Sequence, residues 1–450
     1  MGEQREWVIG PRLWRWRRIG AAASWIGCAA ILAWLGDRVI SGMVRGNAGD
    51  FRHFFWAAEA LRLGEDPYAS GTLGYIYPPL FAWAISPLVP LGMAGAGVVW
   101  GAVNLILILS SMFFAFKIIT NRLKGPRDAA TWATVMIAAA LLSIDQLRAE
   151  VKQGQTDTVV LAAFTLGLYL LGRFPLVAGM VIAIAAQIKH QAALPILYLL
   201  VRGRFKPVLG FAVALPLVAV LPMTTMGKDA WGHAMGQSYG YVSQVSAVSE
   251  HTGESSLHPI IWEKSISIPS AIARWLDGPE GISMLLLTAI VGTMAAGVFA
   301  ITWLIYRSLG MPLFSGRWGA DNESKQPGVV LIEWAGLIIA MLAFSPQAIN
   351  RHGFILLFIH MIAAYLIFVP KSGINRWPLI IGVVLYQVGQ VIPADYVNTQ
   401  SLYGLWHFFS GESWCMLAMW FGLVWTGLDA VKKGYPVFKS ADQIEPVATA

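Results

Sequence analysis

Charge is scarce in this chain: only 13% of its 450 residues are Asp, Glu, Lys or Arg, about half the share found in a soluble domain. Cysteine is scarcer still, and Cys28 and Cys415 both lie in apolar runs, so neither a disulfide nor a metal site is expected there. The sequence has no HExxH, no Walker loop and no GxSxG, and its histidines lack metal-ligand spacing. These absences leave no signature of a zinc protease, a P-loop nucleotide site or a serine hydrolase.

What is abundant is apolar sequence, at 56% of the residues. Long apolar runs separated by short polar segments predict an all-α polytopic integral membrane protein, folded as one domain over residues 1–450. The net charge of +7 is therefore no sign of nucleic-acid binding, because Lys and Arg collect on the cytoplasmic side of membrane proteins. The apolar run Ile19–Ile40 follows several arginines and has no clear cleavage site, which predicts a retained signal anchor.

The apolar runs predict about twelve membrane crossings. They are residues 19–40, 94–119, 129–147, 157–172, 175–188, 190–201, 207–226, 281–305, 328–345, 353–369, 377–392 and 413–430. The pair around Lys189 has an alternative interpretation as a broken or re-entrant element. Ala82–Pro90 is too short to cross and contains two prolines, so we expect it to be an interfacial helix.

The distribution of basic residues sets the predicted orientation. With both termini in the cytoplasm, most Lys and Arg fall on that side, including those of a loop at 307–327. The opposite side then carries the outer segments 41–93, 148–156, Lys189–His190, 227–280, 346–352 and 393–412. Most of the unusual polar groups of the sequence fall on this outer side.

Asp50 is the strongest catalytic candidate in the first outer segment. The apolar residues after it follow helical spacing, which predicts an amphipathic helix on the membrane surface that begins near Asp50. Asp50 is then either the N-cap of that helix or a general base that accepts a proton from a hydroxyl group. Further along, Asp66-Pro67-Tyr68 is typical of a turn and Tyr77-Pro78-Pro79 of a rigid scaffold. Asp66 and Tyr77 are also candidates for substrate contact.

Two further outer segments carry candidates for binding. Gln155 follows a turn glycine, and its amide can bind sugar hydroxyls as donor or acceptor. Asp157 either caps the next helix or contacts substrate. Lys189 lies at membrane depth, where an ammonium group is costly unless it snorkels to the surface or meets an anion such as phosphate.

Arg351 and His352 stand together at an outer helix boundary. They are suited to an anionic headgroup, and snorkelling is the alternative interpretation of Arg351.

The order of these features resembles glycosyltransferase family 87 of the GT-C superfamily, the polyprenol-phosphate-sugar-dependent mannosyltransferases of bacteria. The resemblance rests on motifs spread over most of the chain. They are Asp50-Phe51, Ala57–Leu61, Gly64–Tyr68, Tyr77–Phe81, Gly154-Gln155, Lys189, and Ser345-Pro346 leading to His352. The chain departs from the family pattern at Asp157, at His190-Gln191 and at Ala348-Ile349, which affects the acceptor and the phosphate site more than the reaction class.

The resemblance implies a GT-C fold with juxtamembrane helices in the first outer loop. It also implies Asp50 as the catalytic base, with Lys189 and His352 at the phosphate of a polyprenyl-phosphate sugar donor, and Arg351 beside them. The expected enzyme lies in the bacterial inner membrane and transfers a hexose, by family default mannose, to a lipid or glycan acceptor at the outer face by inverting displacement. No metal or other cofactor is predicted, because cations can neutralise the leaving phosphate.

Two other classes remain open from the sequence. A transporter or lipid flippase would carry inverted repeats and ionisable residues inside its spans, whereas most spans here are free of them. A polymerase or ligase of surface polysaccharide would be expected to carry several arginines in a large outer loop, and residues 227–280 hold only Arg274 with two lysines.

Overall fold

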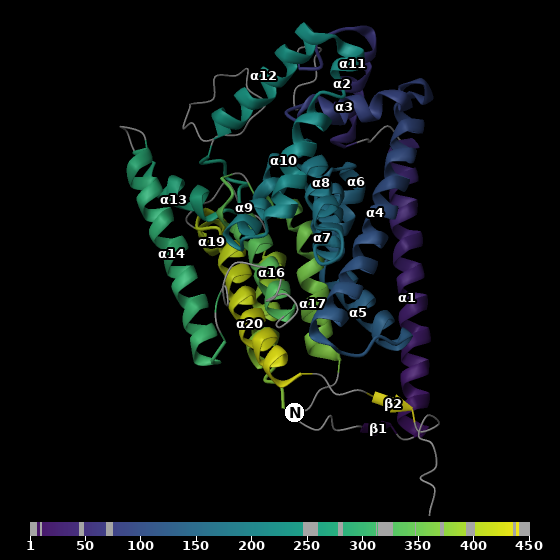
Figure 1. The fold of residues 1–450 in the computed structure, drawn as a ribbon, viewed down its shortest axis with the longest axis vertical. Helices are drawn as coiled ribbons and strands as arrows, with labels where there is room; N and C mark the ends of the chain where they lie inside the picture. Colours follow the sequence, from purple (N-terminus) through teal and green to yellow (C-terminus); the bar gives the residue numbers. More distant parts are fainter. Residues whose placement is uncertain are drawn as a thin grey trace, which may run out of the picture.

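The computed structural model is built almost entirely of helices, most of which run side by side as a bundle (Figure 1). It describes residues 7–9, 11–44, 49–68, 75–245, 260–277, 282–311, 313, 327–346, 348–369, 373–392, 401–434 and 438–440. Most of the predicted cytoplasmic loop 307–327 lies outside these residues, as do parts of the outer segments 41–93, 227–280 and 393–412.

Seven helical stretches of the described chain are long and apolar enough to cross a bilayer. They contain α1 (Pro11–Val44), α4 (Gly92–Leu123), α10 (Phe205–Ala219) with α11 (Met223–Met226), α14 (Met284–Ser308), α16 (Pro327–Phe344), the 3-10 helix η3 (Asn350–Leu356) with α17 (Leu357–Phe368), and α20 (Gly411–Lys433). Four apolar stretches are shorter: α7 (Asp157–Leu170), α8 (Pro175–Ala186), η2 (His190–Ala193) with α9 (Leu194–Val201), and α18 (Trp377–Val391). The chain is therefore a polytopic helical membrane protein, and the number of crossings stays a prediction.

One predicted span is sharply bent. Residues 129–147 are divided between α5 (Ala129–Leu142) and α6 (Ile144–Gln153), which meet at an angle of 72°. The backbone leaves helical geometry at Ser143, whose hydroxyl lies 2.6 Å from Nδ1 of His360 in α17. The predicted outer loop 148–156 is consequently helical over most of its length, because α6 continues to Gln153.

Three short elements lie across one end of the bundle (Figure 1). They are α2 (Phe51–Leu63), α3 (Pro79–Ile85) and the 3-10 helix η1 (Ser86–Leu91). The apolar face of α2 is buried, and Phe54 contacts Phe81 edge-to-face at 5.0 Å between ring centroids. Ala82–Pro90 was predicted as one interfacial helix, but it changes to 3-10 geometry at Ser86, where Pro87 and Pro90 lack the N–H groups of a regular helix.

The segments that were predicted to be polar and on the outer side contain further helices. Residues 227–280 contain α12 (Lys228–Val245) and α13 (Ile268–Leu276), and residues 393–412 contain α19 (Leu402–Phe408). At the end of the molecule away from α2 and α3, β1 (Trp7–Ile9) pairs in parallel with β2 (Phe438–Ser440), a short ladder that an all-α prediction did not include (Figure 1).

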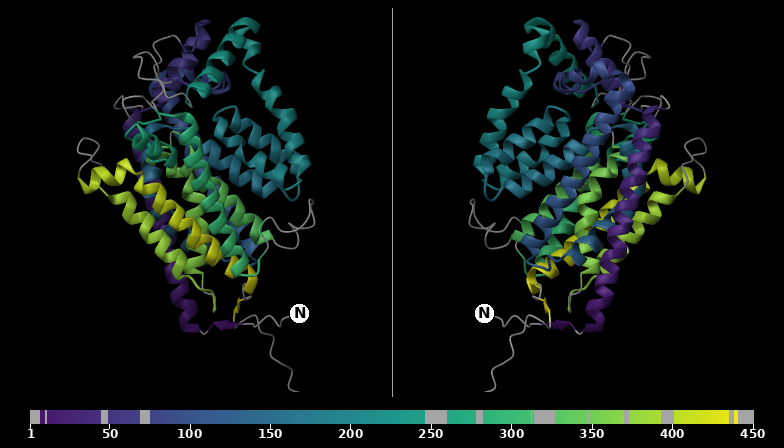
Figure 2. Two further views of the ribbon diagram at one scale, coloured as in Figure 1. Left: turned by 90° about the vertical axis from the view of Figure 1, so that its left-hand side faces the viewer. Right: turned by 90° about the vertical axis from the view of Figure 1, so that its right-hand side faces the viewer.

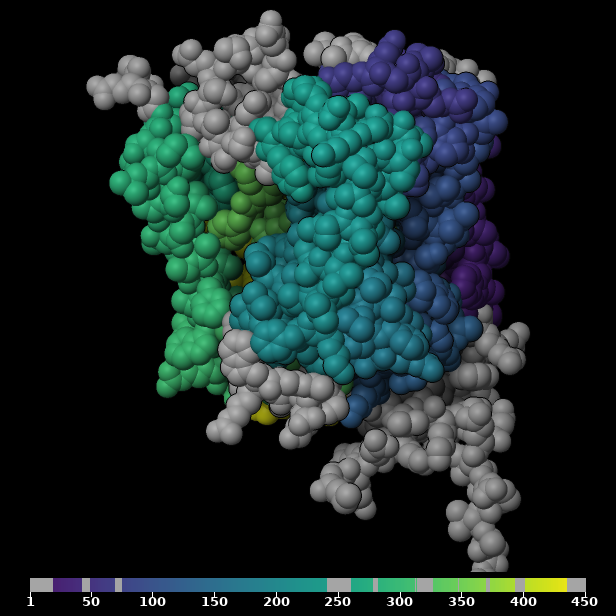
Figure 3. All heavy atoms as spheres, turned by 45° about the horizontal axis from the view of Figure 1, so that its top comes forward, coloured from purple at the N-terminus to yellow at the C-terminus, as the bar shows by residue number. Residues whose placement is uncertain are grey.

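The centre of the bundle is formed by α16 and α17, whose residues are buried on nearly every side. In Figure 2 the helices of residues 157–201 lie on one side of this centre, and α18 and α20 lie on the other. Helix α14 is different, because only Leu287, Thr302 and Tyr306 of its residues are buried. Between α14 and the helices α9, α16 and α20 lies a mostly apolar groove of about 380 Å³, and a hollow is visible beside α14 in Figure 3.

Candidate functional site

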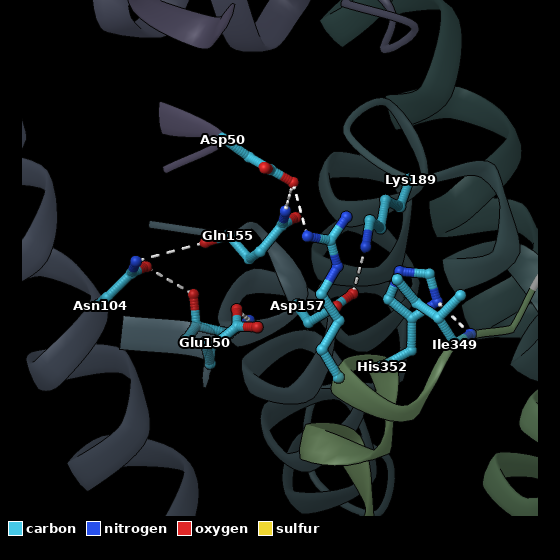
Figure 4. Close-up of polar contacts among 10 residues, drawn as sticks. Asp50, Asn104, Glu150, Gln155, Asp157, Lys189, Ile349 and His352 are labelled. Atoms are coloured by element: carbon cyan, nitrogen blue, oxygen red, sulfur yellow. Dashed lines mark hydrogen bonds and ion pairs between the residues drawn. The ribbon is translucent and has the colours of Figure 1, made fainter. Parts of the chain in front are cut away.

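Four chain segments that are far apart in the sequence meet in one place (Figure 4). They are the residue before α2, the junction of α6 and α7, the junction of α8 and η2, and the start of η3. They contribute six of the eight predicted site residues: Asp50, Gln155, Asp157, Lys189, Arg351 and His352. Six of the polar residues predicted from the sequence therefore form one cluster.

Glycines bring the first two of these segments into contact. Gly49 and Gly154 both have positive φ, at 54° and 63°. A Cβ atom on Gly154 would lie 2.8 Å from Cβ of Phe51, so the close approach of this turn to α2 requires glycine. Helix α4 holds the turn from the other side, because the indole of Trp100 donates to the carbonyl oxygen of Gly154 over 2.8 Å.

Asp50 points into the cluster and does not cap α2. It precedes the helix with α-helical dihedral angles, and its side chain makes no cap hydrogen bond. Its Oδ2 atom accepts from the amide of Gln155 and lies 2.9 Å from Nη1 of Arg351. Asp50 therefore occupies the N-cap position without the capping hydrogen bond that the N-cap interpretation expects, and Arg351 contacts its carboxylate instead. The side chains of Asp50 and Arg351 are each 31% exposed, so the pair borders solvent.

Asp157 and Lys189 form a buried ion pair beside Asp50 and Gln155. Asp157 is the first residue of α7, its N-cap is Thr156, and its Oδ1 atom binds Nζ of Lys189. Lys189 is only 10% exposed, which excludes snorkelling. Burial disfavours the charged form of Lys189, but the carboxylate of Asp157 outweighs it and raises the pKa of the ammonium group above its ordinary value. Lys189 is therefore a permanent cation at neutral pH.

Tyr77 and His352 lie within electrostatic range of this ion pair. Lys189 and Asp157 act electrostatically on the Tyr77 hydroxyl, whose pKa is raised by burial, so this hydroxyl keeps its proton and can donate a hydrogen bond. His352 interacts electrostatically with the same two charges. The backbone N–H of Ile349 donates to Nδ1 of His352 over 3.4 Å, so Nε2 carries the proton in the neutral ring (Figure 4).

Two residues of this cluster, Glu150 and Asn104, were not predicted from the sequence. Glu150 is fully buried, and its Oε1 atom accepts from the backbone N–H of Thr158 over 3.1 Å. Asn104 accepts from the Thr158 hydroxyl over 2.6 Å and donates to the carbonyl oxygen of Gln155 over 3.3 Å. A signal was present for Glu150, because helical spacing places it on the same face as Leu147 and Val151, which are also buried.

Asp66 is not bonded to this cluster in the described structure. Its Oδ1 atom accepts from the backbone N–H of Tyr68 over 2.9 Å, which confirms the predicted turn. Its Oδ2 atom lies 3.2 Å from Nε2 of His233 in α12. The placement of Asp66 fits a structural link between the first outer segment and α12.

The cluster combines groups that can move a proton with groups that can hold an anion. Asp50 is a carboxylate at the solvent border, and the cations Arg351 and Lys189 lie close by. Within the described residues, Oε1 of Gln155 and Oδ2 of Asp157 are buried without a hydrogen-bond partner, which leaves acceptors for the hydroxyls of a ligand. Among the same residues, no group of three His, Cys, Asp or Glu side chains is placed to hold a metal ion.

Comparison with known proteins shows to which family the chain belongs. No curated protein matches the chain. Among protein families, glycosyltransferase family 87 matches residues 75–320, more than half of the chain. The match includes Tyr77, Gln155, Asp157 and Lys189 and leaves Asp50, Arg351 and His352 outside it. The chain therefore belongs to glycosyltransferase family 87 and is a membrane glycosyltransferase.

Proposed function

We propose that this glycosyltransferase moves a hexose, mannose by the default of its family, from a polyprenyl-phosphate donor to a lipid or glycan acceptor. The proposed fold is GT-C, and the proposed site faces the outer side of the bacterial inner membrane with both chain termini in the cytoplasm. The observation that carries the proposal is the convergence of Asp50 with Arg351, Lys189 and His352 in one cluster at the end of an apolar bundle.

Asp50 has the placement of a general base in this proposal. The acceptor hydroxyl gives its proton to the Asp50 carboxylate and attacks the anomeric carbon of the donor, and the bond from that carbon to the phosphate oxygen breaks. The amide of Gln155 and the guanidinium of Arg351 both bind Oδ2, which orients the carboxylate and leaves Oδ1 for the acceptor. A single displacement of this kind converts a β-linked donor into an α-linked product.

The departing phosphate would be stabilised by fixed positive charge and hydrogen-bond donors. Lys189 supplies a permanent cation, the neutral His352 supplies Nε2–H, and the Tyr77 hydroxyl supplies a third donor. Asp157 keeps the ammonium group charged and in place while the site has no substrate. Arg351 lies beside the base, where it can approach the phosphate as well.

The proposal is tested with purified protein in lipid vesicles. Vesicles are supplied with polyprenyl-phosphate mannose or polyprenyl-phosphate glucose together with a membrane lipid extract as acceptor, and the lipid products are identified by mass spectrometry. We expect a lipid product heavier by one hexose and the release of polyprenyl phosphate in equal amount. Transfer from a sugar nucleotide instead of the polyprenyl donor would contradict the proposal, as would movement of an unchanged glycolipid across the membrane without a new product.

Glu150 gives a second prediction, which concerns the placement of Asp157. Glu150→Ala removes the acceptor of the Thr158 N–H at the start of α7, and we expect a loss of about 1–3 kcal/mol in the free energy of unfolding together with slower transfer. Glu150→Gln keeps an oxygen for that hydrogen bond, so it should retain more stability and activity than Glu150→Ala. Thermal unfolding and transfer rates check both variants. Equal losses in the two variants would show that the hydrogen bond to the Thr158 N–H does not account for the effect of Glu150.

A further inference from the structure

The loop that carries Arg351 and His352 is held by a segment from a distant part of the chain. Ser265 forms an antiparallel β-bridge with Ile349, and the backbone N–H of Ile266 donates to the carbonyl oxygen of Ala348 over 2.8 Å. These contacts lie two to four residues before Arg351 and His352. The position of residues 260–267 therefore influences where these two side chains point.

Two serine hydroxyls reinforce this attachment. Ser270, in the first turn of α13, donates to the carbonyl oxygen of Pro346 over 2.8 Å. The hydroxyl of Ser265 donates to the carbonyl oxygen of Ala348 over 3.2 Å. Both serines are buried. Pro346, Ala348 and Ile349 are thus all bonded to residues 265–270, which we call the brace.

Arg274 fixes the brace to the rest of the bundle. Its guanidinium donates to the backbone carbonyl oxygen of Ser265 in the brace over 3.2 Å and to that of Trp262, which precedes the brace, over 2.9 Å. The same group donates to the carbonyl oxygens of His407 and Phe408, each at 3.0 Å, and to the hydroxyl of Ser410 at 3.0 Å. One side chain therefore joins the brace to the corner between α19 and α20.

This corner is itself rigidly bonded. The Ser410 hydroxyl donates to the carbonyl oxygen of Ser267 over 2.9 Å, and Ser413 donates to that of Ile266 over 2.5 Å. The buried His407 and Glu412 pair at 2.9 Å across the same turn. Arg274 thus links the corner between α19 and α20 to the brace, and the brace contacts the loop of the candidate site.

We propose that Arg274 is a positioning residue, which holds the brace so that residues 346–349 present Arg351 to Asp50 and His352 to the donor phosphate. The role of Arg274 in transfer rests on the proposed function, whereas its effect on the loop does not. The planar fork of arginine suits acceptors that lie in different directions, and a lysine in its place would keep the charge but reach only some of them.

The chain offers a matched control for Arg274→Lys. Arg122 also joins separate helices through backbone carbonyls, donating to Pro327 over 3.2 Å and to Leu168 over 3.3 Å. It lies at the end of α4 far from the candidate site. Arg122→Lys should therefore lower stability in the same way without changing the loop 346–352.

Hydrogen–deuterium exchange, measured without substrate, tests whether Arg274 holds the loop that carries Arg351 and His352. We expect Arg274→Lys to speed exchange in a peptide covering residues 346–353, and Arg122→Lys to leave that peptide as it is in the wild type. Unchanged exchange in the Arg274→Lys protein would overturn the proposal, even if transfer from polyprenyl-phosphate sugars were never detected. A lack of transfer by the wild type, with faster exchange in the variant, would count against the proposed function alone.

The kinetics of transfer test whether Arg274 also contributes to the reaction. Arg274→Lys should lower kcat/KM for the polyprenyl-phosphate donor by about tenfold or more, because small displacements of positioning groups have effects of this size, while KM for the acceptor changes little. In a His352→Gln background, the same substitution should have a much smaller effect, because the two changes act on one step. The proposal would be overturned if Arg274→Lys lowered kcat/KM for the donor equally in the wild-type and His352→Gln backgrounds. It would also be overturned if Arg274→Lys and Arg122→Lys lowered this kcat/KM by the same factor.

Discussion

Asp50→Asn is expected to reduce glycosyl transfer by about 10²- to 10⁴-fold, the range by which a positioned general base accelerates a reaction. Asparagine has the same shape and keeps an oxygen that can accept from Gln155 and Arg351, but it cannot take the proton of the acceptor hydroxyl. The fold should be retained, because Asp50 borders solvent and does not cap α2. Single-turnover transfer and thermal unfolding of the purified variant measure the two effects separately.

The matched control for Asp50→Asn is Glu59→Gln. Glu59 lies on the exposed face of α2, the helix that Asp50 precedes, and its substitution makes the same change of carboxylate to amide. We expect Glu59→Gln to transfer sugar at the wild-type rate. Turnover of Asp50→Asn within a few-fold of the wild type would exclude Asp50 as the base, and loss of activity in both variants would indicate a general effect of charge on this surface.

The buried pair of Asp157 and Lys189 should give the largest effect on stability. Asp157→Asn leaves the ammonium group of Lys189 without its counter-ion, and Lys189→Met leaves the Asp157 carboxylate without its partner. Breaking a buried ion pair from one side costs about 3–5 kcal/mol, because an uncompensated charge stays buried. Each single variant should therefore unfold at a clearly lower temperature than the wild type and transfer little or no sugar.

The double variant Asp157→Asn/Lys189→Met separates stability from catalysis. It removes both charges, so most of the lost stability should return, whereas transfer should not, because the cation for the leaving phosphate is missing. Thermal unfolding and single-turnover rates of the four proteins make a complete double-mutant cycle. A double variant as unstable as either single variant would contradict the coupling, and transfer by Lys189→Met at the wild-type rate would exclude Lys189 from the phosphate site.

A second buried ion pair provides the control for this cycle. Arg202 and Glu333 pair at the other end of the bundle, where Glu333 also accepts from the hydroxyl of Tyr198 over 2.6 Å. Glu333→Gln should lower stability, since it removes the counter-ion of a partly buried guanidinium. Its folded fraction should still transfer sugar, because none of these groups touches the candidate site.

The resemblance to family 87 and the pattern of apolar runs already determined much about this protein. Apolar runs of about twenty residues have few stable alternatives in a bilayer, because every backbone polar group must be bonded within its own helix. Each predicted span accordingly falls on helical residues of the structure, although residues 129–147 are bent at Ser143 and the spans 190–201, 207–226 and 353–369 each cover two successive helical elements. Family membership, enzyme class and the helical membrane architecture could all be predicted before any contact was known.

The partners of the site residues were decided by the tertiary structure. Asp50 with Arg351, and Asp157 with Lys189, are pairs from separate segments, and no local spacing predicts them. The spacing of Leu147 and Val151 indicated that Glu150 is buried, but its partner, the backbone N–H of Thr158, lies in α7 and was decided by packing. Asp66 matched the family motif, but the turn and His233 engage it away from the cluster.

The physical reason for this division is the range of the forces involved. Burial of apolar helices depends on composition over a few turns, so the sequence by itself determines the spans and the polar loops between them. The direction of a charged side chain depends on which counter-ion or hydrogen-bond partner the fold brings within about 4 Å, and those partners come from remote segments. Asp50, Lys189 and His352 could therefore be identified as candidates from the sequence. The groups that each of them faces were determined only by the folded bundle.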